Sequence, residues 1–239
     1  MVIAVTSQAV LAQSAGAVRI LSLNRPEKLN ALNFEMQQQL LAQLRSVAAD
    51  NDVRVLILTG AGKAFCAGGD HAVRLEAVHG GFQRREEIRR DYLETMRCLM
   101  GLSIPVIAAV NGIAAGFGAG LVALCDIVVM GEHAALSDPH VKFDLYADPA
   151  AQLMWPRLTS PIIARELLLS GRQVEAREAL DIGLANKVCP RGEELAVALE
   201  LAKEFVQVPP AGIAATKRFL TRRLIEEFEE LFAAMGEAG

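Results

Sequence analysis

The sequence predicts an α/β protein whose C-terminal part is helical. Short apolar runs typical of buried strands alternate with segments of helical period over the first part of the chain, and only helical patterns follow. With 52% apolar and 22% charged residues among 239, the chain can bury the core of one domain. We expect a core over residues 1–190 and a helical region over 191–239.

The first elements are two strands and a helix. The strands are expected at about 2–6 and 17–23. Asn33 is placed to cap a helix over about 34–50, because its side chain can accept a hydrogen bond from the first turn. Apolar residues recur along that helix at helical spacing, namely Met36, Leu40, Leu44 and Val47.

Further apolar runs at 53–59 and 105–110 each predict a buried strand. Between them lies an arginine-rich segment, 82–90, whose charges alternate in sign. Such alternation favours a solvated helix over a nucleic-acid-binding patch. After the second strand we expect a helix through 121–124 and another strand at 127–130.

The elements expected in the last third are all helices. Ser160-Pro161 is a typical helix start, and Gly171 ends the helix that follows. A shorter helix is expected over 175–182. Long amphipathic helices are predicted over 193–207 and 211–235.

Two of the predicted strands lead into glycine-rich turns, and each turn is followed by the expected start of a helix. The first turn reads Gly-Ala-Gly-Lys-Ala-Phe-Cys-Ala-Gly-Gly-Asp over 60–70, and the second reads Asn-Gly-Ile-Ala-Ala-Gly-Phe-Gly-Ala-Gly over 111–120. Glycine allows the backbone to approach a ligand closely, and the first N–H groups of a helix have no internal partner. Two such turns facing one pocket would each supply one N–H donor to an anion or to a developing oxyanion. The second turn is not a dinucleotide fingerprint, because no suitable acidic residue follows about twenty positions later.

Composition narrows the class of protein. The net charge of −4 argues against a nucleic-acid partner. The four cysteines are scattered without a C-x-x-C pair, which is typical of reduced thiols in a cytoplasmic protein. The apolar start of the chain lacks a basic segment, so we interpret it as a strand rather than a signal peptide. No apolar run approaches the length of a membrane span, and His79 and His133 fit no metal-ligand spacing.

Seven segments carry a family resemblance, and their order and spacing are far more specific than any one of them. They are Leu23–Leu32, Ala64–Asp70, Pro105–Ala115, Cys125–Ile127, Ser137–Pro139, Leu168–Gly171 and Ala179–Ala185. Through them the chain resembles the crotonase superfamily, also called the enoyl-CoA hydratase/isomerase family. The resemblance implies a spiral of ββα units with a helical C-terminal region, assembly as homotrimers or dimers of trimers, and acyl-CoA substrates. It implies no metal or redox cofactor, since coenzyme A enters only as part of the substrate.

The resemblance also implies a set of site residues. The oxyanion hole falls on the backbone N–H groups of Gly69 and Phe117, the latter at a position where the family usually has glycine. The residues that line the substrate or the coenzyme A are Lys28, Ala31, Ala67, Asp70, His71, Ile113, Gly116 and Pro139. Taken from the residues alone, Asp70 is equally suited to cap a helix. Lys28 could instead be a solvated loop lysine, and a position on a surface helix is favoured for His71.

The chain departs from the family at the acid–base positions. Hydratases of the family use two glutamates, and these positions hold Gly120 and His140. Glycine cannot supply a base, so isomerisation, decarboxylation or carbon–carbon cleavage is expected rather than hydration. His140 is the candidate acid or base, because its ordinary pKa near 6.5 suits proton transfer at neutral pH. Asp144, Asp148 or Asp138 could orient its ring.

Two other functions remain open. A β-diketone-cleaving branch of the superfamily uses a histidine at position 140 and an aspartate nine residues later, where this chain has Pro149 next to Asp148. The chain could therefore be a hydrolase that does not need coenzyme A. It could also be an acyl-CoA-binding homologue without catalysis, in which His140 is only a wall residue. The resemblance further implies that relatives continue with one more helix after the segment 215–218, so some of their coenzyme A contacts are expected either to be absent here or to come from a neighbouring subunit.

Overall fold

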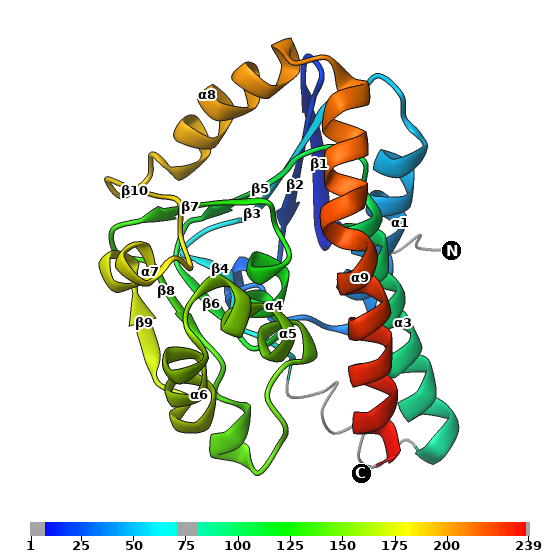
Figure 1. The fold of residues 1–239 in the computed structure, drawn as a ribbon, viewed down its shortest axis with the longest axis vertical. Coiled ribbons are helices and arrows are strands. Elements are labelled where there is room, and N and C mark those ends of the chain that lie inside the picture. Colours follow the sequence, from blue (N-terminus) through cyan, green and yellow to red (C-terminus); the bar gives the residue numbers. More distant parts are fainter. Residues whose placement is uncertain (1–7, 71–80, 238–239) are drawn as a thin grey trace, which may run out of the picture.

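The computed structural model describes residues 8–70 and 81–237, which build two β-sheets surrounded by helices (Figure 1). The larger sheet has the strand order β1-β2-β3-β5-β7-β10, and the smaller has the order β4-β6-β8-β9. The strands of the larger sheet are β1 (Val10–Ala15), β2 (Val18–Leu23), β3 (Val55–Gly60), β5 (Val106–Val110), β7 (Ile127–Gly131) and β10 (Lys187–Cys189). Those of the smaller are β4 (Ala64–Cys66), β6 (Ile113–Ala115), β8 (Ala135–Ser137) and β9 (Gln173–Glu175).

The central strands form a repeated unit. Each of β3, β5 and β7 lies in the larger sheet and is followed by a short strand of the smaller sheet, β4, β6 or β8, and then by a helix. Both sets of strands are parallel within their sheets. The chain therefore winds as a spiral of ββα units, which confirms the predicted α/β class. The helices of these units are α3 (Gly81–Gly101), α4 (Phe117–Ala123) and α5 (Pro149–Leu158).

Both faces of the larger sheet are buried. In β3, Leu56 and Leu58 face the main core, whereas Val55 and Ile57 face a second apolar cluster. Helix α8 (Glu194–Gln207) covers this second face, where the small side chains of Ala198 and Ala202 are buried. Burial on two faces explains why β3 is a continuous apolar run in the sequence rather than an alternating one.

The remaining helices surround the sheets. Figure 1 shows α9 standing beside α3, and α9 also packs against α5. Their bounds are α1 (Phe34–Ala49), α6 (Pro161–Ser170), α7 (Ala176–Ile182) and α9 (Pro210–Glu237), with short 3-10 helices η1 (Pro26–Lys28) and η2 (His140–Phe143). In the described parts of the chain, no helix combines the length and the apolar character needed to cross a bilayer.

The predicted helix ends are confirmed by their caps. The Asn33 side chain accepts a hydrogen bond from the Met36 N–H at 2.9 Å, and Ser160 accepts one from the Ile163 N–H at 3.4 Å. Gly171, with φ +60°, ends α6 in the left-handed conformation that favours glycine. The arginine-rich segment is part of α3, as expected.

Several elements were not predicted. Three-residue strands such as β4 and β6 are too short to show a period in the sequence, and α5 carries Pro156 inside it, which argues against a helix on propensity alone. Strand β1 pairs antiparallel with β2 and exposes most of its side chains. The strand expected at 2–6 lies outside the described residues. The division of the chain at residue 190 stays a prediction. Of the two helices that follow it, α8 packs on the larger sheet and α9 packs on α3 and α5.

Candidate functional site

The two glycine-rich turns lie against each other. Each contains a strand of the smaller sheet, β4 in the first and β6 in the second. These strands are parallel neighbours, so the residues that follow them lie at the same edge of that sheet. A Cβ atom added to Gly118 would lie 2.4 Å from the Cys66 carbonyl oxygen, and one added to Gly68 would lie 3.1 Å from that of Ala115. Glycine is therefore required for the backbones to approach this closely.

The N–H groups of Gly69 and Phe117 are both available at this edge. Leu32 bridges the first turn, since its N–H donates to Gly68 O at 2.7 Å and its carbonyl accepts from Asp70 N at 2.8 Å. This bridge turns the Gly69 N–H to the opposite side. Phe117 is the first residue of α4, whose leading N–H groups have no helical acceptor. Within residues 8–70 and 81–237, neither N–H donates to a backbone or side-chain acceptor.

His140 lies next to this pair of donors. Its ring packs over Gly116, where an added Cβ would lie 2.9 Å from Cε1 and 3.4 Å from Nε2. Gly116 precedes Phe117 and has φ +51°, a conformation that also favours glycine. The absence of a side chain at Gly116 therefore brings the imidazole beside the Phe117 amide.

Asp138 orients the His140 ring. Its carboxylate is fully buried, and Oδ1 lies 2.6 Å from His140 Nδ1. Its Oδ2 accepts the backbone N–H of Asp148 at 2.6 Å. Of the three aspartates left open by the sequence, Asp138 is the one bonded to Nδ1. Asp144 is exposed at the end of η2, with φ +58° and its N–H directed to Val141 O.

Asp148 is buried in the same site. It caps α5 by accepting from Ala150 N at 2.9 Å, and the Tyr92 hydroxyl donates to its carboxylate, 2.9 Å from either oxygen. A Cβ added to Gly120 would lie 2.4 Å from its Oδ1. The carboxylate of Asp148 thus fills the space above Gly120, a position that the sequence analysis treated only as a missing side chain.

Burial dominates the ionisation of these groups. It raises the pKa of Asp148 to about 6; the charge of Asp138 adds to this rise, whereas His140 and the Tyr92 hydroxyl oppose it. Burial and the neighbouring Asp148 raise the pKa of Tyr92 well above its usual value, so the phenol stays neutral and donates. Burial raises the pKa of the Cys66 thiol to about 12, which makes it a poor nucleophile.

Tyr92 is the residue of this site that the sequence analysis missed. It shares one face of α3 with Met96 and Leu99, both fully buried. A tyrosine on an apolar helix face needs a hydrogen-bond partner for its hydroxyl. The helical spacing of Tyr92 from Met96 and Leu99 was therefore the signal in the sequence that could have identified it. Its ring packs edge-on against Phe117, at 5.8 Å between centroids, and parallel to Phe232 of α9, at 5.6 Å.

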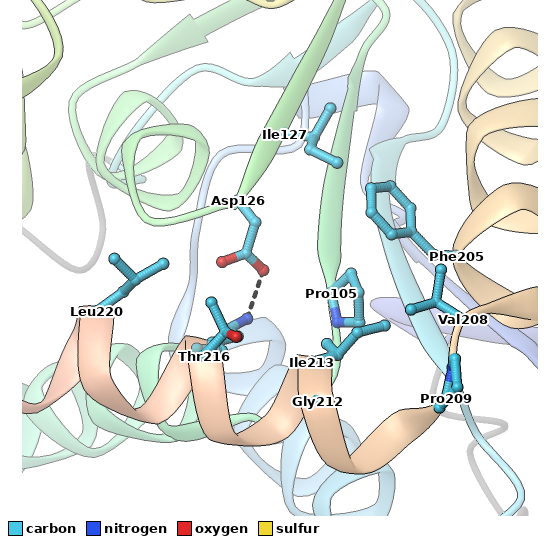
Figure 2. A pocket seen from close by; sticks show the side chains of 11 residues that line it. Pro105, Asp126, Ile127, Phe205, Val208, Pro209, Gly212, Ile213, Thr216 and Leu220 are labelled. Atoms are coloured by element: carbon cyan, nitrogen blue, oxygen red, sulfur yellow. Dashed lines mark hydrogen bonds and ion pairs between the residues drawn. The ribbon is translucent and has the colours of Figure 1, made fainter.

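A cavity of about 320 Å³ adjoins His140. It is lined by Ile88, Arg89, Tyr92, His140, Leu145, Tyr146, Ala147, Asp148, Pro149, Phe232 and Met235. A larger cavity, of about 460 Å³, lies at the amino ends of β5 and β7, next to α8 and α9. Figure 2 shows the side chains that line it. Its walls are mainly apolar, and its charged groups are Asp126 and Lys217, which pair with each other. The smaller cavity is therefore the one that combines space with acid–base groups.

The residues expected on the coenzyme A side form two groups. Arg25 joins Ala31 and Asp70, through bonds of 2.6 Å to Ala31 O and 2.8 Å to Asp70 Oδ2. The Ala67 N–H donates to Leu29 O in the loop that also contains the exposed Lys28. Around the second turn, Ile113 starts β6, Gly116 precedes α4 and Pro139 precedes η2. His71 lies outside the described residues.

Comparisons with known proteins give matches over most of the chain. Residues 13–235 match the family model described as Enoyl-CoA hydratase/isomerase. The chain is 35% identical over 210 residues to 1,2-epoxyphenylacetyl-CoA isomerase of Escherichia coli, covering 87% of this chain and 80% of that one. It is 31% identical over 232 residues to short-chain-enoyl-CoA hydratase of Clostridium acetobutylicum, covering 96% and 87%. The crystal structure of an enoyl-CoA hydratase/isomerase from Mycobacterium paratuberculosis has a TM-score of 0.87 and 34% identity, covering 97% of this chain and 93% of that one.

Proposed function

The chain belongs to the enoyl-CoA hydratase/isomerase family, and on this premise we propose that it converts an acyl-CoA thioester through an enolate, as an isomerase rather than a hydratase. The observation that carries the proposal is the His140 ring packed on Gly116, beside the Phe117 N–H. The N–H donor that would polarise the thioester carbonyl and the side chain that would transfer the proton are thereby next to each other.

The thioester carbonyl is activated by the backbone. Its oxygen binds between the N–H groups of Gly69 and Phe117, and removal of a proton from the α-carbon moves negative charge onto that oxygen. Donors held in place by the fold stabilise this charge without reorganising. Each donor contributes about 3 kcal/mol to lowering the barrier, as in other oxyanion holes.

His140 transfers the α-proton. Because Nδ1 donates to the buried carboxylate of Asp138 at 2.6 Å, the neutral ring carries its lone pair on Nε2, which serves as the base. When Nε2 takes up the proton, the Asp138 carboxylate stabilises the imidazolium. Asp138 thus has the orienting role for which three aspartates were considered.

Burial of Asp148 favours isomerisation over water addition. Hydration needs a group that holds and deprotonates a water molecule. Gly120 has no such group, and the carboxylate above it is only 3% exposed and already accepts bonds from Tyr92 and the start of α5. The relatives include both an isomerase and a hydratase, so the choice rests on this environment.

The substrate binds with its two halves on different sides of His140. The coenzyme A half lies along Lys28, Ala31, Ala67 and Asp70, beside the first glycine turn. The acyl half enters the cavity of about 320 Å³, whose walls include the rings of Tyr92 and Phe232. This apolar lining suits a hydrocarbon acyl group.

Mass-spectrometric turnover of a thioester panel tests the proposal. The panel contains crotonyl, β,γ-enoyl, malonyl-type and β-ketoacyl thioesters of coenzyme A, together with a free β-diketone. We expect the β,γ-enoyl thioester to be converted to its α,β-isomer, and His140→Ala to slow this by about 10²- to 10⁴-fold. His133→Ala removes a histidine outside the site and should keep full activity.

Other results would lead to other functions. Equal turnover by His140→Ala would remove that residue from the mechanism. Turnover of the free diketone alone, lost in His140→Ala, would identify a hydrolase that does not need coenzyme A. Thioester binding without any product would indicate a binding protein.

A further inference from the structure

Arg89 is a charged residue in the wall of the cavity beside His140, and the proposed function gives it no role. It comes from α3 and lines the cavity together with apolar and aromatic side chains. Its side chain is 29% exposed, so the guanidinium has lost part of its hydration. That loss is costly unless the charge meets a suitable partner. A guanidinium in the wall of a substrate cavity is therefore a candidate for contact with the substrate.

Two contacts with α9 hold the guanidinium in place. Nη2 of Arg89 donates to Phe232 O at 3.1 Å. Its Cζ lies 4.9 Å from the centroid of the Phe232 ring, within the range of a cation–π interaction. A guanidinium has five N–H donors, and the bond to Phe232 O uses one of them. Because the group is already held, binding a ligand to its other donors costs less side-chain entropy.

The charge of Arg89 is only loosely balanced by the protein. Among the described residues, its closest carboxylate is that of Glu86, whose Oε1 lies 3.9 Å from Nε. This distance is too long for a hydrogen bond, and the Glu86 side chain is exposed, so the pair is weak. Asp148 lines the same cavity, but its carboxylate accepts bonds from Tyr92 and from the start of α5. The guanidinium therefore keeps donors for an anionic ligand.

Arg89 lies farther from the proposed reacting end of the cavity than Tyr92 does. Tyr92 contacts the ring of Phe117 and the carboxylate of Asp148, which are close to the proposed oxyanion donors. Arg89 precedes Tyr92 by three residues, about 4.5 Å along the axis of α3. The ring of Phe232 contacts both of them. An acyl chain that begins at the oxyanion donors and passes these rings therefore ends beside the guanidinium.

We propose that Arg89 binds a carboxylate at the far end of the acyl group, so that the preferred substrate is the coenzyme A thioester of a dicarboxylic acid. This inference rests on the proposed function, because it names the acyl group that enters the cavity. The carbon chain contacts the rings of Tyr92 and Phe232, and the terminal carboxylate accepts hydrogen bonds from the guanidinium. Arginine suits this role because its planar fork matches the two oxygens of a carboxylate.

The test compares thioesters that differ in one group. One is the coenzyme A thioester of a saturated six-carbon monocarboxylic acid, and the other is that of the six-carbon dicarboxylic acid joined through one carboxyl group. Neither has a double bond to move, so calorimetry measures binding without isomerisation. We expect the wild-type protein to bind the second about 10- to 100-fold more tightly, the effect of hydrogen bonds to a charged group. Four- and eight-carbon pairs are included, because the position of Arg89 limits the chain length that fits.

Arg89→Met removes the charge and keeps an unbranched apolar side chain. We expect the affinity for the dicarboxylic thioester to fall to that for the monocarboxylic one, which should itself change by less than about twofold. Arg90→Met is the matched control, since Arg90 is the next residue of α3 and is exposed; it should leave both affinities unchanged. Arg89→Lys keeps the charge without the planar fork, so it should retain part of the preference.

Two results would overturn the role of Arg89. One is the absence of a preference for the dicarboxylic thioester at all three chain lengths in the wild-type protein, a result that needs no variant to fold. The other is equal weakening of both thioesters in Arg89→Met, which would show that Arg89 only joins α3 to α9. Turnover of the β,γ-unsaturated forms of both thioesters tests the proposed function separately. A binding preference without isomer from either would support Arg89 and overturn the isomerase, whereas isomer from both without a preference would do the reverse.

Discussion

At the scale of single residues, two glycines decide what the site can contain. Gly116 leaves room for the His140 ring, and Gly120 leaves room for the Asp148 carboxylate. In both cases a group from another element enters the space above a glycine of the second turn. Close contact of this kind makes alanine at either position a disruptive substitution, even though it adds only one methyl group.

The buried Asp148 should reduce stability at neutral pH. Its folded-state pKa of about 6 lies above its ordinary value of 3.8, so the cost is complete above about pH 6 and absent below about pH 4, where both states are protonated. Two pKa units correspond to about 3 kcal/mol. Asp148→Asn should therefore raise the free energy of unfolding by about 1–3 kcal/mol at pH 7.5, with the gain shrinking as the pH falls. Urea unfolding at several pH values measures this, and a difference that does not vary with pH would contradict it.

The sequence could predict some site residues and not others. Gly69 and Phe117 follow from the glycine-rich turns and the family resemblance, and the structure brings their N–H groups to one edge. The partner of His140 could not be chosen, because Asp138, Asp144 and Asp148 are all near it in sequence. Only the fold turns Asp138 inward and leaves Asp144 exposed.

At the scale of elements, α9 is the helix that links distant parts of the chain. Near its start, the ammonium of Lys217 pairs with Asp126 (Figure 2). The same ammonium donates to Ile104 O at 2.8 Å. Toward its end, the rings of Phe228 and Phe232 stack on Tyr92. The helix that holds this ion pair therefore also forms part of the wall of the cavity beside His140.

Removing that ion pair should destabilise the protein. Asp126→Ala leaves the buried ammonium of Lys217 without its carboxylate and also removes the acceptor of the Val106 N–H. We expect a loss of about 2 kcal/mol in the free energy of unfolding, less than for a fully buried pair because Asp126 is partly exposed. The exposed pair of Lys203 and Glu200 provides the control, since Glu200→Ala should cost less than about 0.5 kcal/mol. Equal losses in the two variants, measured by urea unfolding, would refute this role.

Helices and strands could be predicted where they are long enough to show a period and have recognisable capping residues. The helix after Asn33 and the helix between Ser160 and Gly171 appear where their end signals place them. Three-residue strands such as β4 and β6 carry no period, yet they bring the two glycine turns together. Their pairing is a long-range property, which local sequence patterns do not contain.

At the scale of the whole molecule, large apolar side chains remain on the surface of the single chain. Among the described residues, the most exposed of these are Ile162 and Leu169 of α6 and Phe219 and Leu220 of α9, each between 69% and 77% exposed. Exposed apolar groups of this size are typical of contact surfaces between chains. We propose that they are covered in the homotrimer or dimer of trimers that the family resemblance implies.

Light scattering coupled to gel filtration checks this assembly. We expect a mass of about three or six times 25.7 kDa, the mass of one chain, because assembly removes these side chains from water. Leu169→Glu should lower the mass or weaken the assembly at low concentration, whereas Lys203→Glu, at an exposed position outside this set, should not. A mass equal to one chain would contradict the proposal.

The oxyanion donors that we propose, the N–H groups of Gly69 and Phe117, belong to the main chain, and this has a consequence for how such a protein can change over generations. A point mutation replaces a side chain and leaves the amide at that position, unless it introduces proline. The carbonyl-polarising part of the site is therefore largely protected from loss by mutation. The groups on either side of it, His140 above one glycine and Asp148 above another, can be exchanged one at a time. New reactions can thus arise around an inherited electrophilic centre without rebuilding the fold.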